Sequence, residues 1–255
     1  MKLLQTKSLD ISIGGWSVCR DLNFCLEPGQ YWGILGGNGI GKTTLLQTLA
    51  GLRPSASGEV LIEGIPLCEI RRRDLARKLG VLFQDSHDIF PGSVMETVLI
   101  GRHPWLPVWA FEGREDFALA EAALRDVAMD TMVHRQVNTL SGGERRRLAL
   151  ATLLLQDPKI WLLDEPTNHL DMKHQINLLQ LIRTRVDAAR GGLVMVLHDV
   201  NLITRFCSHV ILMQDHETMQ AGPVNQVVSQ ETLERLYRHP IRRVDVEGGC
   251  LYYPG

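Results

Sequence analysis

The sequence lacks the features of several classes of protein. Its five cysteines are scattered, without a C-x-x-C pair, so neither a disulfide framework nor a zinc site is predicted. The formal net charge of −2 shows no basic excess, so we expect no nucleic-acid partner. No apolar run approaches the about 18 residues that a membrane-spanning helix needs, and MKLLQTKSLD lacks the apolar core of a signal peptide. These absences predict a cytoplasmic protein.

Short apolar runs that end in polar residues recur along the chain. The 255 residues are 45% hydrophobic and 22% charged, as in a globular domain. The four clearest runs are YWGILG (31–36), KLGVLF (78–83), KIWLLD (159–164) and GGLVMV (191–196). Such runs, separated by helical patterns, predict parallel strands buried on both faces. The first 30 residues and EVLIEG (59–64) alternate between apolar and polar and predict antiparallel strands at one side.

The middle of the chain has a different pattern. Residues 86–156 contain no convincing strand, and EDFALAEAALRDVAMD (115–130) has apolar residues at helical spacing. We therefore predict a helical subdomain inserted into an α/β core. After residue 201 the sequence predicts a helix, a strand at HVILM (209–213) and two short helical stretches.

A glycine-rich segment follows the first apolar run. GGNGIGKT (36–43) matches the phosphate-loop pattern G-x-x-x-x-G-K-[S/T] and precedes a helical pattern closed by Gly51. Its glycines allow backbone N–H groups to approach phosphate oxygens. Lys42 is expected to reach the β- and γ-phosphates and Thr43 to ligate Mg²⁺. The residues expected at the nucleotide are Gly36, Gly37, Asn38, Gly39, Ile40, Gly41, Lys42, Thr43 and Thr44. A glycine-rich turn that binds nothing would not require this strand–loop–helix context.

Polar residues end three of the other predicted strands. Ligands of open parallel sheets bind at the carboxyl ends of strands, so Asp164 is expected near Mg²⁺ and Glu165 near an attacking water. Gln84 is a candidate ligand of Mg²⁺ or contact of this water. His198 is a candidate contact of the γ-phosphate or of water. From spacing alone, structural roles for Gln84 and His198 stay equally open.

A second glycine-rich helix start occurs at LSGGERRRLAL (140–150). Ser141 and Glu144 have the spacing of a capping box. The glycines at 142 and 143 oppose helix stability, since each costs about 1 kcal/mol relative to Ala. A helix start with backbone exposed by glycines is an anion site, which explains them. We expect the run Arg145–Arg147 on the helix surface.

Taken in order, six of these segments resemble the ATP-binding cassette of ABC transporters: GGNGIGKT, Gln84, LSGGE, LLDEP, NHLD and His198. The resemblance implies an α/β P-loop NTPase (RecA-like) fold. Its core would comprise residues 1–84, with an N-terminal antiparallel β subdomain, and 156–205; the helical subdomain would be 85–155 and the C-terminal part 206–255. It also implies that Glu165 is the catalytic base, Gln84 the Q-loop residue and His198 the switch histidine.

The resemblance further implies a nucleotide shared between two copies of the chain. Asp171 would be the D-loop aspartate that contacts the partner copy. Ser141, Gly142, Gly143 and Glu144 would face the γ-phosphate held by the partner, since this segment lies too far from its own Lys42.

Three tryptophans have open roles. Many cassettes stack the adenine on an aromatic residue before Gly-Gly, but Ile13 occupies that position here. Trp16 is either an adenine contact or a solvent-shielded structural residue, and selectivity for ATP rests on the family. The region 85–109 is expected to contact a permease. Within it, Trp105 and Trp109 are either part of that contact or part of the subdomain core.

A narrower resemblance concerns the direction of transport. IGRHPW, TNHLD with HQINLLQLI, VLHDVNLI and the tail RRVDVEG are similar to ATPases of type II importers for cobalamin, iron-siderophores and haem. This implies a motor using ATP and Mg²⁺ at the cytoplasmic face of the inner membrane. Its partners would be a second copy, two transmembrane permease subunits and, indirectly, a periplasmic or surface substrate-binding protein.

Other functions of related proteins were compared with this one, and two of them, a molybdate importer and an exporter motor, remain alternatives. Molybdate importers share the architecture, and an exporter motor is the nearest rival. Translation factors of the superfamily carry two cassettes, and chromosome and repair relatives carry coiled-coil or zinc modules; neither feature occurs here. A small-molecule kinase would need neither LSGGE nor the D-loop. The sequence does not identify the cargo.

Overall fold

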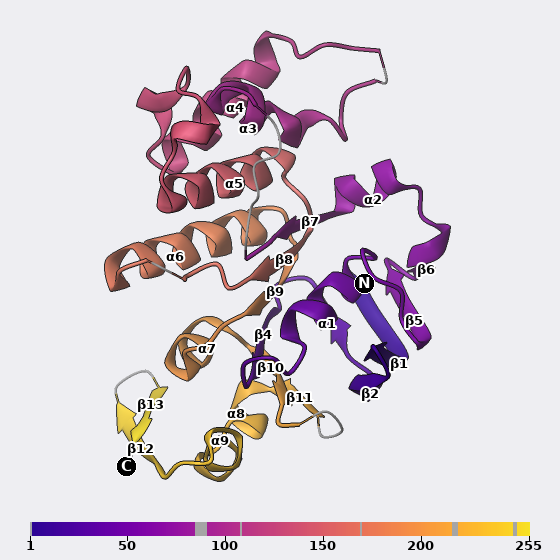
Figure 1. Ribbon diagram of the computed structural model, residues 1–255, viewed down its shortest axis with the longest axis vertical. Helices are drawn as coiled ribbons and strands as arrows, with labels where there is room; N and C mark the ends of the chain where they lie inside the picture. The colour runs from indigo at the N-terminus through magenta and orange to yellow at the C-terminus, as the bar shows by residue number, and fades with distance from the viewer. Residues whose placement is uncertain (1, 85–90, 108, 169, 216–218, 247–248) are drawn as a thin grey trace.

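The computed structural model describes residues 2–84, 91–107, 109–168, 170–215, 219–246 and 249–255. Its centre is a six-stranded sheet with the order β11–β10–β4–β9–β8–β7 (Figure 1). The strands are β4 (Tyr31–Gly36), β7 (Leu79–Leu82), β8 (Ile160–Asp164), β9 (Gly192–Val196), β10 (His209–Met213) and β11 (Met219–Pro223). All neighbours are parallel except β11, which pairs antiparallel with β10 at the edge.

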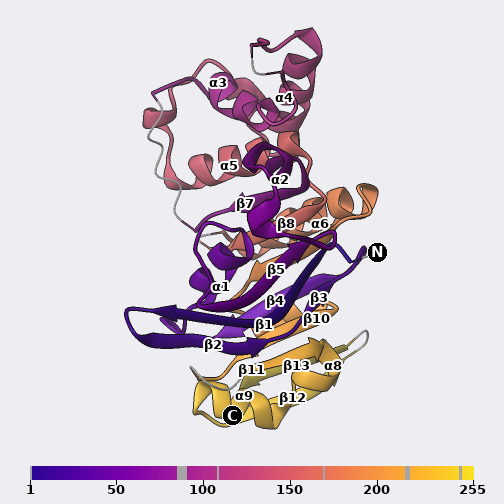
Figure 2. The same ribbon diagram turned by 90° about the vertical axis from the view of Figure 1, so that its right-hand side faces the viewer.

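A second sheet is antiparallel and includes the N-terminal hairpin (Figure 2). It comprises β1 (Leu4–Ile13), β2 (Trp16–Leu22), β3 (Cys25–Leu26), β5 (Ser57–Ile62) and β6 (Ile65–Pro66). A separate hairpin of β12 (Ile241–Val246) and β13 (Gly249–Pro254) lies at the C-terminal end of the described chain.

The helices are distributed along the whole chain. They are α1 (Lys42–Leu49), α2 (Arg72–Lys78), α3 (Val94–Leu99), α4 (Arg114–Asp126), α5 (Gly142–Gln156), α6 (Met172–Ala188), α7 (Val200–Phe206), α8 (Val224–Val227) and α9 (Gln230–Tyr237). Short 3₁₀ helices occur at Leu67–Glu69, Ile100–Arg102, Asp130–Met132 and Val137–Thr139. Between β7 and β8 the chain leaves the sheet to form α3, α4 and α5, at the top of Figure 1.

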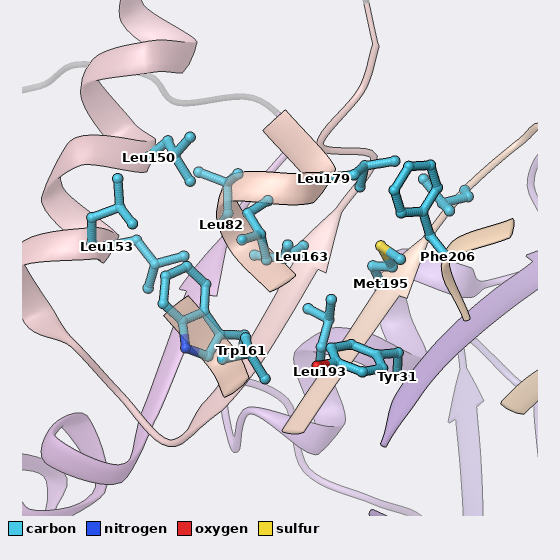
Figure 3. Packing of buried hydrophobic residues seen from close by; sticks show 14 of the residues in the cluster. Tyr31, Leu82, Leu150, Leu153, Trp161, Leu163, Leu179, Leu193, Met195 and Phe206 are labelled. Atoms are coloured by element: carbon cyan, nitrogen blue, oxygen red, sulfur yellow. The ribbon is translucent and has the colours of Figure 1, made fainter. Parts of the chain in front are cut away.

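Apolar side chains on the two faces of the central sheet form two hydrophobic cores. Successive side chains of a strand point to opposite faces. Trp161 and Leu163 of β8 therefore pack on the face covered by α5, α6 and α7 (Figure 3). Ile160 and Leu162 pack on the other face, against α1 and the antiparallel sheet. Burial on both faces explains why these runs are almost wholly apolar.

The architecture predicted from the sequence is largely confirmed. The four apolar runs form parallel strands, HVILM forms β10, and the N-terminal segments form antiparallel strands. The described part of residues 86–156 contains no strand, only an isolated bridge between Ser93 and Gln136. The strands β6, β11, β12 and β13 were not predicted. No helix in the described ranges is long and apolar enough to cross a membrane.

The cysteines have no disulfide partners. Cys19 and Cys207 are buried, Cys25 and Cys250 are half-buried and Cys68 is exposed. Burial raises the pKa of Cys19 to about 12, so this thiol stays protonated. Cys19 and Cys207 therefore act as packing residues.

Candidate active site

The glycine-rich loop connects the carboxyl end of β4 with the start of α1. Gly39 and Gly41 have φ values of +75° and +107°, which favour glycine. A Cβ at Gly41 would also lie 2.3 Å from Val18 Cγ1 of β2. Gly51 has φ +69° and follows the cap residue Ala50, so it closes α1 as predicted. Backbone geometry thus requires glycine at the turn that starts the helix.

Lys42 lies across this loop. Its side chain is buried, and Nζ donates to the carbonyls of Gly36 at 2.9 Å and Gly37 at 2.8 Å. Burial lowers the pKa of Lys42, and the carboxylates of Glu165 and Asp164 oppose that shift. Gly37, Asn38 and Gly39 form the exposed crest of the loop. The arrangement places a cation and exposed backbone at a helix start, which fits an anionic ligand.

Asp164 ends β8 and is 1% exposed. Within the described residues, neither of its carboxylate oxygens has a hydrogen-bond partner. Burial raises the pKa of Asp164, and the nearby Thr43 hydroxyl is the largest effect that lowers it. Unsatisfied buried polar atoms are rare in native structures, so these two oxygens are available to a ligand. A carboxylate beside a hydroxyl is a donor set that fits Mg²⁺.

Glu165 lies at the centre of a polar cluster. Its Oε2 accepts from Gln84 Nε2 at 2.8 Å and from the Asn168 side-chain amide, and its Oε1 lies 2.6 Å from His198 Nε2. Its backbone has φ +50°, a conformation that non-glycine residues rarely adopt and that is found often at functional sites. The strand ends therefore bring together Gln84, Glu165 and His198, as the sequence analysis expected.

The cluster has the composition needed for proton transfer. A carboxylate accepts a proton from water when its position is held and the product charge is stabilised. Here a neutral amide and an imidazole hold both carboxylate oxygens of Glu165. Asp164 precedes Glu165 at the end of β8, and Lys42 lies at the start of α1. The site can thus bind an anion and deprotonate a water molecule beside it.

The second glycine-rich segment forms the predicted helix start. Ser141 is the N-cap of α5; its Oγ accepts from Glu144 N, and Glu144 Oε2 accepts from Ser141 N at 2.7 Å. The backbone N–H of Ser141 is the main cause of the lowered pKa of Glu144. A Cβ added at Gly142 or Gly143 would meet no atom within 4 Å beyond the helix's own backbone. Packing within this chain therefore does not require these two glycines.

Arg135 compensates the charge of Glu144 at this helix start. Its Nη1 lies 2.9 Å from Glu144 Oε1, and its other nitrogens donate to the hydroxyl and carbonyl of Thr139. An unpaired carboxylate would repel an anion approaching the glycines. Arg135 thus balances the charge of Glu144 at this helix start.

A pair of substitutions tests this compensation. For the ATPase that the six motifs predict, we expect Arg135→Gln to lower turnover about tenfold, because the Glu144 charge then opposes the phosphate. Adding Glu144→Gln is expected to restore most of the turnover, although the Thr139 contacts remain lost. Steady-state ATPase rates of the two single variants and the double variant measure this. An equally inactive double variant would mean that the loop contacts, not the charge, explain the loss.

The remaining predicted residues lie in different surroundings. Asp171 is the N-cap of α6 and accepts from His174 N at 2.9 Å.

Trp16 is 74% exposed in the β1–β2 hairpin, so its interpretation as a solvent-shielded residue is wrong; the adenine contact stays a prediction. Trp109 is 93% exposed, so it is not subdomain core. Trp105 instead donates from Nε1 to the Gln156 carbonyl at the end of α5. Residues 85–90 and 108 of the expected permease contact lie outside the described residues.

Two residues of the site were missed by the sequence analysis. Asn168 was quoted only as part of a motif, yet its amide contacts Glu165. Arg146 was expected only to lie on the helix surface with Arg145 and Arg147, and all three are half-buried. The guanidinium of Arg146 reaches the carbonyls of Phe83, Gln84, Asp164 and Glu165. A run of arginines contains no local signal that distinguishes these roles.

Comparison with known proteins supplies the family. A model of the ABC transporter family matches residues 19–168. The chain belongs to the ABC transporter family. The ferric enterobactin transport ATP-binding protein of Escherichia coli K12 is 34% identical over 235 residues, covering 92% of this chain and 86% of that protein. The hemin import ATP-binding protein of Myxococcus xanthus is 34% identical over 252 residues, covering 96% and 93%.

A solved structure supports the fold. The dimeric structure of a post-hydrolysis state of an ATP-binding cassette, bound to ADP and phosphate, has a TM-score of 0.75 and 26% identity. The match covers 87% of this chain and 99% of that one. The predicted fold class, a P-loop ABC ATPase with an antiparallel β subdomain and inserted helices, is confirmed, and so is the family assigned from the six motifs.

Proposed function

We propose that this ABC ATPase is the motor subunit of an importer for a metal chelate such as a ferric siderophore, haem or cobalamin. The observation that carries the ATPase activity is the Glu165 cluster beside the phosphate loop. The import of a chelate is supported by relatives along nearly the whole chain that are named for transport of ferric enterobactin and import of hemin. An importer for molybdate and an exporter are the alternatives.

In this proposal the residues of the phosphate loop hold ATP. Backbone N–H groups of Gly37 to Thr44 bind the phosphates, and Lys42 turns from its two loop carbonyls toward them. Thr43, Asp164 and Gln84 would hold Mg²⁺, which neutralises phosphate charge when bound. Glu165 would accept the proton of the attacking water, and His198, 2.6 Å from Glu165, would contact the γ-phosphate.

The working unit is proposed to be a dimer. Gly142 and Gly143 have open space in front of them and no structural reason within their own chain. A phosphate held by a second copy supplies that reason, since a side chain would block its approach. Ser141 would donate to the same phosphate, and Asp171 would contact the second copy.

The motor needs a membrane partner in this proposal. Two permease subunits would bind it at the cytoplasmic face of the membrane, and a substrate-binding protein would act through them. Trp109 and Phe111, 93% and 92% exposed, lie at or beside the region expected to contact the permease.

The test is to isolate the native complex and identify the permease. The purified complex is then reconstituted in vesicles with its substrate-binding protein, and uptake of ferric siderophores, haem, cobalamin and molybdate is measured with ATP present. We expect ATP-dependent uptake of one metal chelate. Accumulation of molybdate alone, or co-purification with an exporter-type permease, would contradict the proposed cargo class.

A further inference from the structure

Arg146 connects the helix of the second anion site with the catalytic strand ends. Its Nη1 donates to the Gln84 carbonyl at 2.7 Å and to the Phe83 carbonyl, just beyond β7. Its Nη2 donates to the carbonyls of Asp164 and Glu165, each at 2.7 Å, at the end of β8. One planar guanidinium thus binds four backbone carbonyls from two strands. Charge-assisted bonds of this kind are stronger than neutral ones.

These contacts continue the pairing of β7 with β8 beyond the sheet. The backbone ladder between the two strands extends as far as Leu82 opposite Leu163. Beyond that pair, the carbonyls on both strands need other donors. Asn168 N donates to the Glu165 carbonyl at 3.2 Å. Arg146 donates to that carbonyl and to those of Phe83, Gln84 and Asp164, and so bridges the two strand ends. The side chains of Gln84 and Glu165, 2.8 Å apart, belong to the two segments that this bridge joins.

The helix α5 is firmly packed on the same strands. Residues 146, 150 and 153 follow the i, i+4, i+7 spacing of one helix face. Figure 3 shows Leu150 and Leu153 directed toward Leu82, Leu163 and Trp161. All five side chains are buried in one core. A shift of this part of α5 would therefore move Arg146 relative to the strand exits.

The same helix begins at the glycine-rich segment. Ser141 is its N-cap, five residues before Arg146, so little more than one helical turn separates the proposed partner phosphate from the guanidinium. A displacement of this helix end is transmitted through Arg146 to the backbone of Gln84 and Glu165. The contact is a continuous physical path from the glycine-rich helix start, which would face the partner's nucleotide, to Gln84 and Glu165, which would face the chain's own nucleotide. It therefore joins the two composite sites of the proposed dimer.

We propose that Arg146 is a positioning residue that holds Gln84 and Glu165 in register and makes their alignment depend on the position of α5. The proposal rests on the proposed function, in which Glu165 is the catalytic base. Arg146 touches backbone atoms rather than substrate, so its loss should lower the rate of the chemical step and leave ATP binding at the phosphate loop in place.

The experiment compares three variants of the full chain. Arg146→Gln removes the charged fork, Arg146→Lys keeps the charge without the fork, and Arg145→Gln is the matched control. Arg145 is the neighbouring residue, and its guanidinium donates to the carbonyls of Leu140 and Asn138 in the segment just before its own helix. For each variant kcat, KM, the affinity for a fluorescent ATP analogue and Tm are measured.

We expect Arg146→Gln to lower kcat about tenfold or more, with affinity within about twofold of wild type and little change in Tm. Arg146→Lys should regain part of kcat, and Arg145→Gln should stay within about twofold. Two results would overturn the proposal. One is a kcat of Arg146→Gln within twofold of wild type. The other is a parallel fall of kcat, affinity and Tm in both Arg146 variants, which marks a structural role alone.

Failure of the proposed function has a different signature. It would appear in the unmodified chain, which would not hydrolyse ATP, or in a Glu165→Gln variant that retained turnover. Neither result depends on Arg146. The two conclusions can therefore be separated in one set of measurements.

Discussion

Glu165→Gln is expected to lower ATP turnover at least about 100-fold while leaving ATP binding intact. The amide has nearly the size of the carboxylate but does not accept a proton from water. It keeps a carbonyl oxygen that accepts from Gln84 or Asn168, so the cluster retains most of its contacts. The measurement is ATPase rate against ATP concentration, combined with equilibrium binding of a fluorescent ATP analogue.

A second glutamate serves as control for this variant. Glu59 lies on β5, and its side chain is 56% exposed beside Lys7. Glu59→Gln should change neither turnover nor binding, because exposed ion pairs contribute little. Near-normal turnover of Glu165→Gln would remove Glu165 from its role as base. Loss of ATP binding together with turnover would indicate that the side chain organises the site instead.

Gly143→Ala is expected to abolish most of the ATPase activity without destabilising the fold. The added Cβ meets open space in the chain itself, and Ala favours a helix over Gly by up to about 1 kcal/mol. Tm should therefore stay equal or rise. In the dimer, the same methyl group would lie against the phosphate held by the partner copy. Turnover should fall about tenfold or more, and Gly143→Asp should abolish it through charge repulsion.

Gly113→Ala, at the start of another helix, is the control for Gly143→Ala, and the opposite effects on stability and turnover are expected from it. Gly113 is the N-cap of α4, and a Cβ there would meet only Asp116 Oδ2, at 3.9 Å. Gly113→Ala should lower stability slightly, since Ala is a poor N-cap, and leave turnover unchanged. ATPase assays and thermal unfolding of both glycine variants provide the comparison. Full activity in the Gly143→Asp variant within the assembled transporter would contradict the composite site.

Local sequence was sufficient for features whose causes are local. The capping box at Ser141 and Glu144 depends on residues three apart, and the phosphate loop depends on glycines at fixed spacing. The apolar runs predicted strands because burial on both faces demands apolar residues at every position. Their polar ends then predicted that Gln84, Asp164 and His198 meet at one edge of the sheet. All three lie at strand ends of the site in the folded chain.

The sequence by itself therefore determined the family and the fold class, and it predicted which residues of the phosphate loop and strand ends form the site. Tertiary structure decided which long side chains reach that site. Arg146 and Arg145 are neighbours of one chemical type, yet only the packing of α5 on β7 and β8 turns the guanidinium of Arg146 toward four strand-end carbonyls. The contact spans more than 60 residues between Arg146 and Gln84, and no local spacing encodes it. It arises because carbonyls beyond the strand ladder require donors, and the fold places Arg146 beside them.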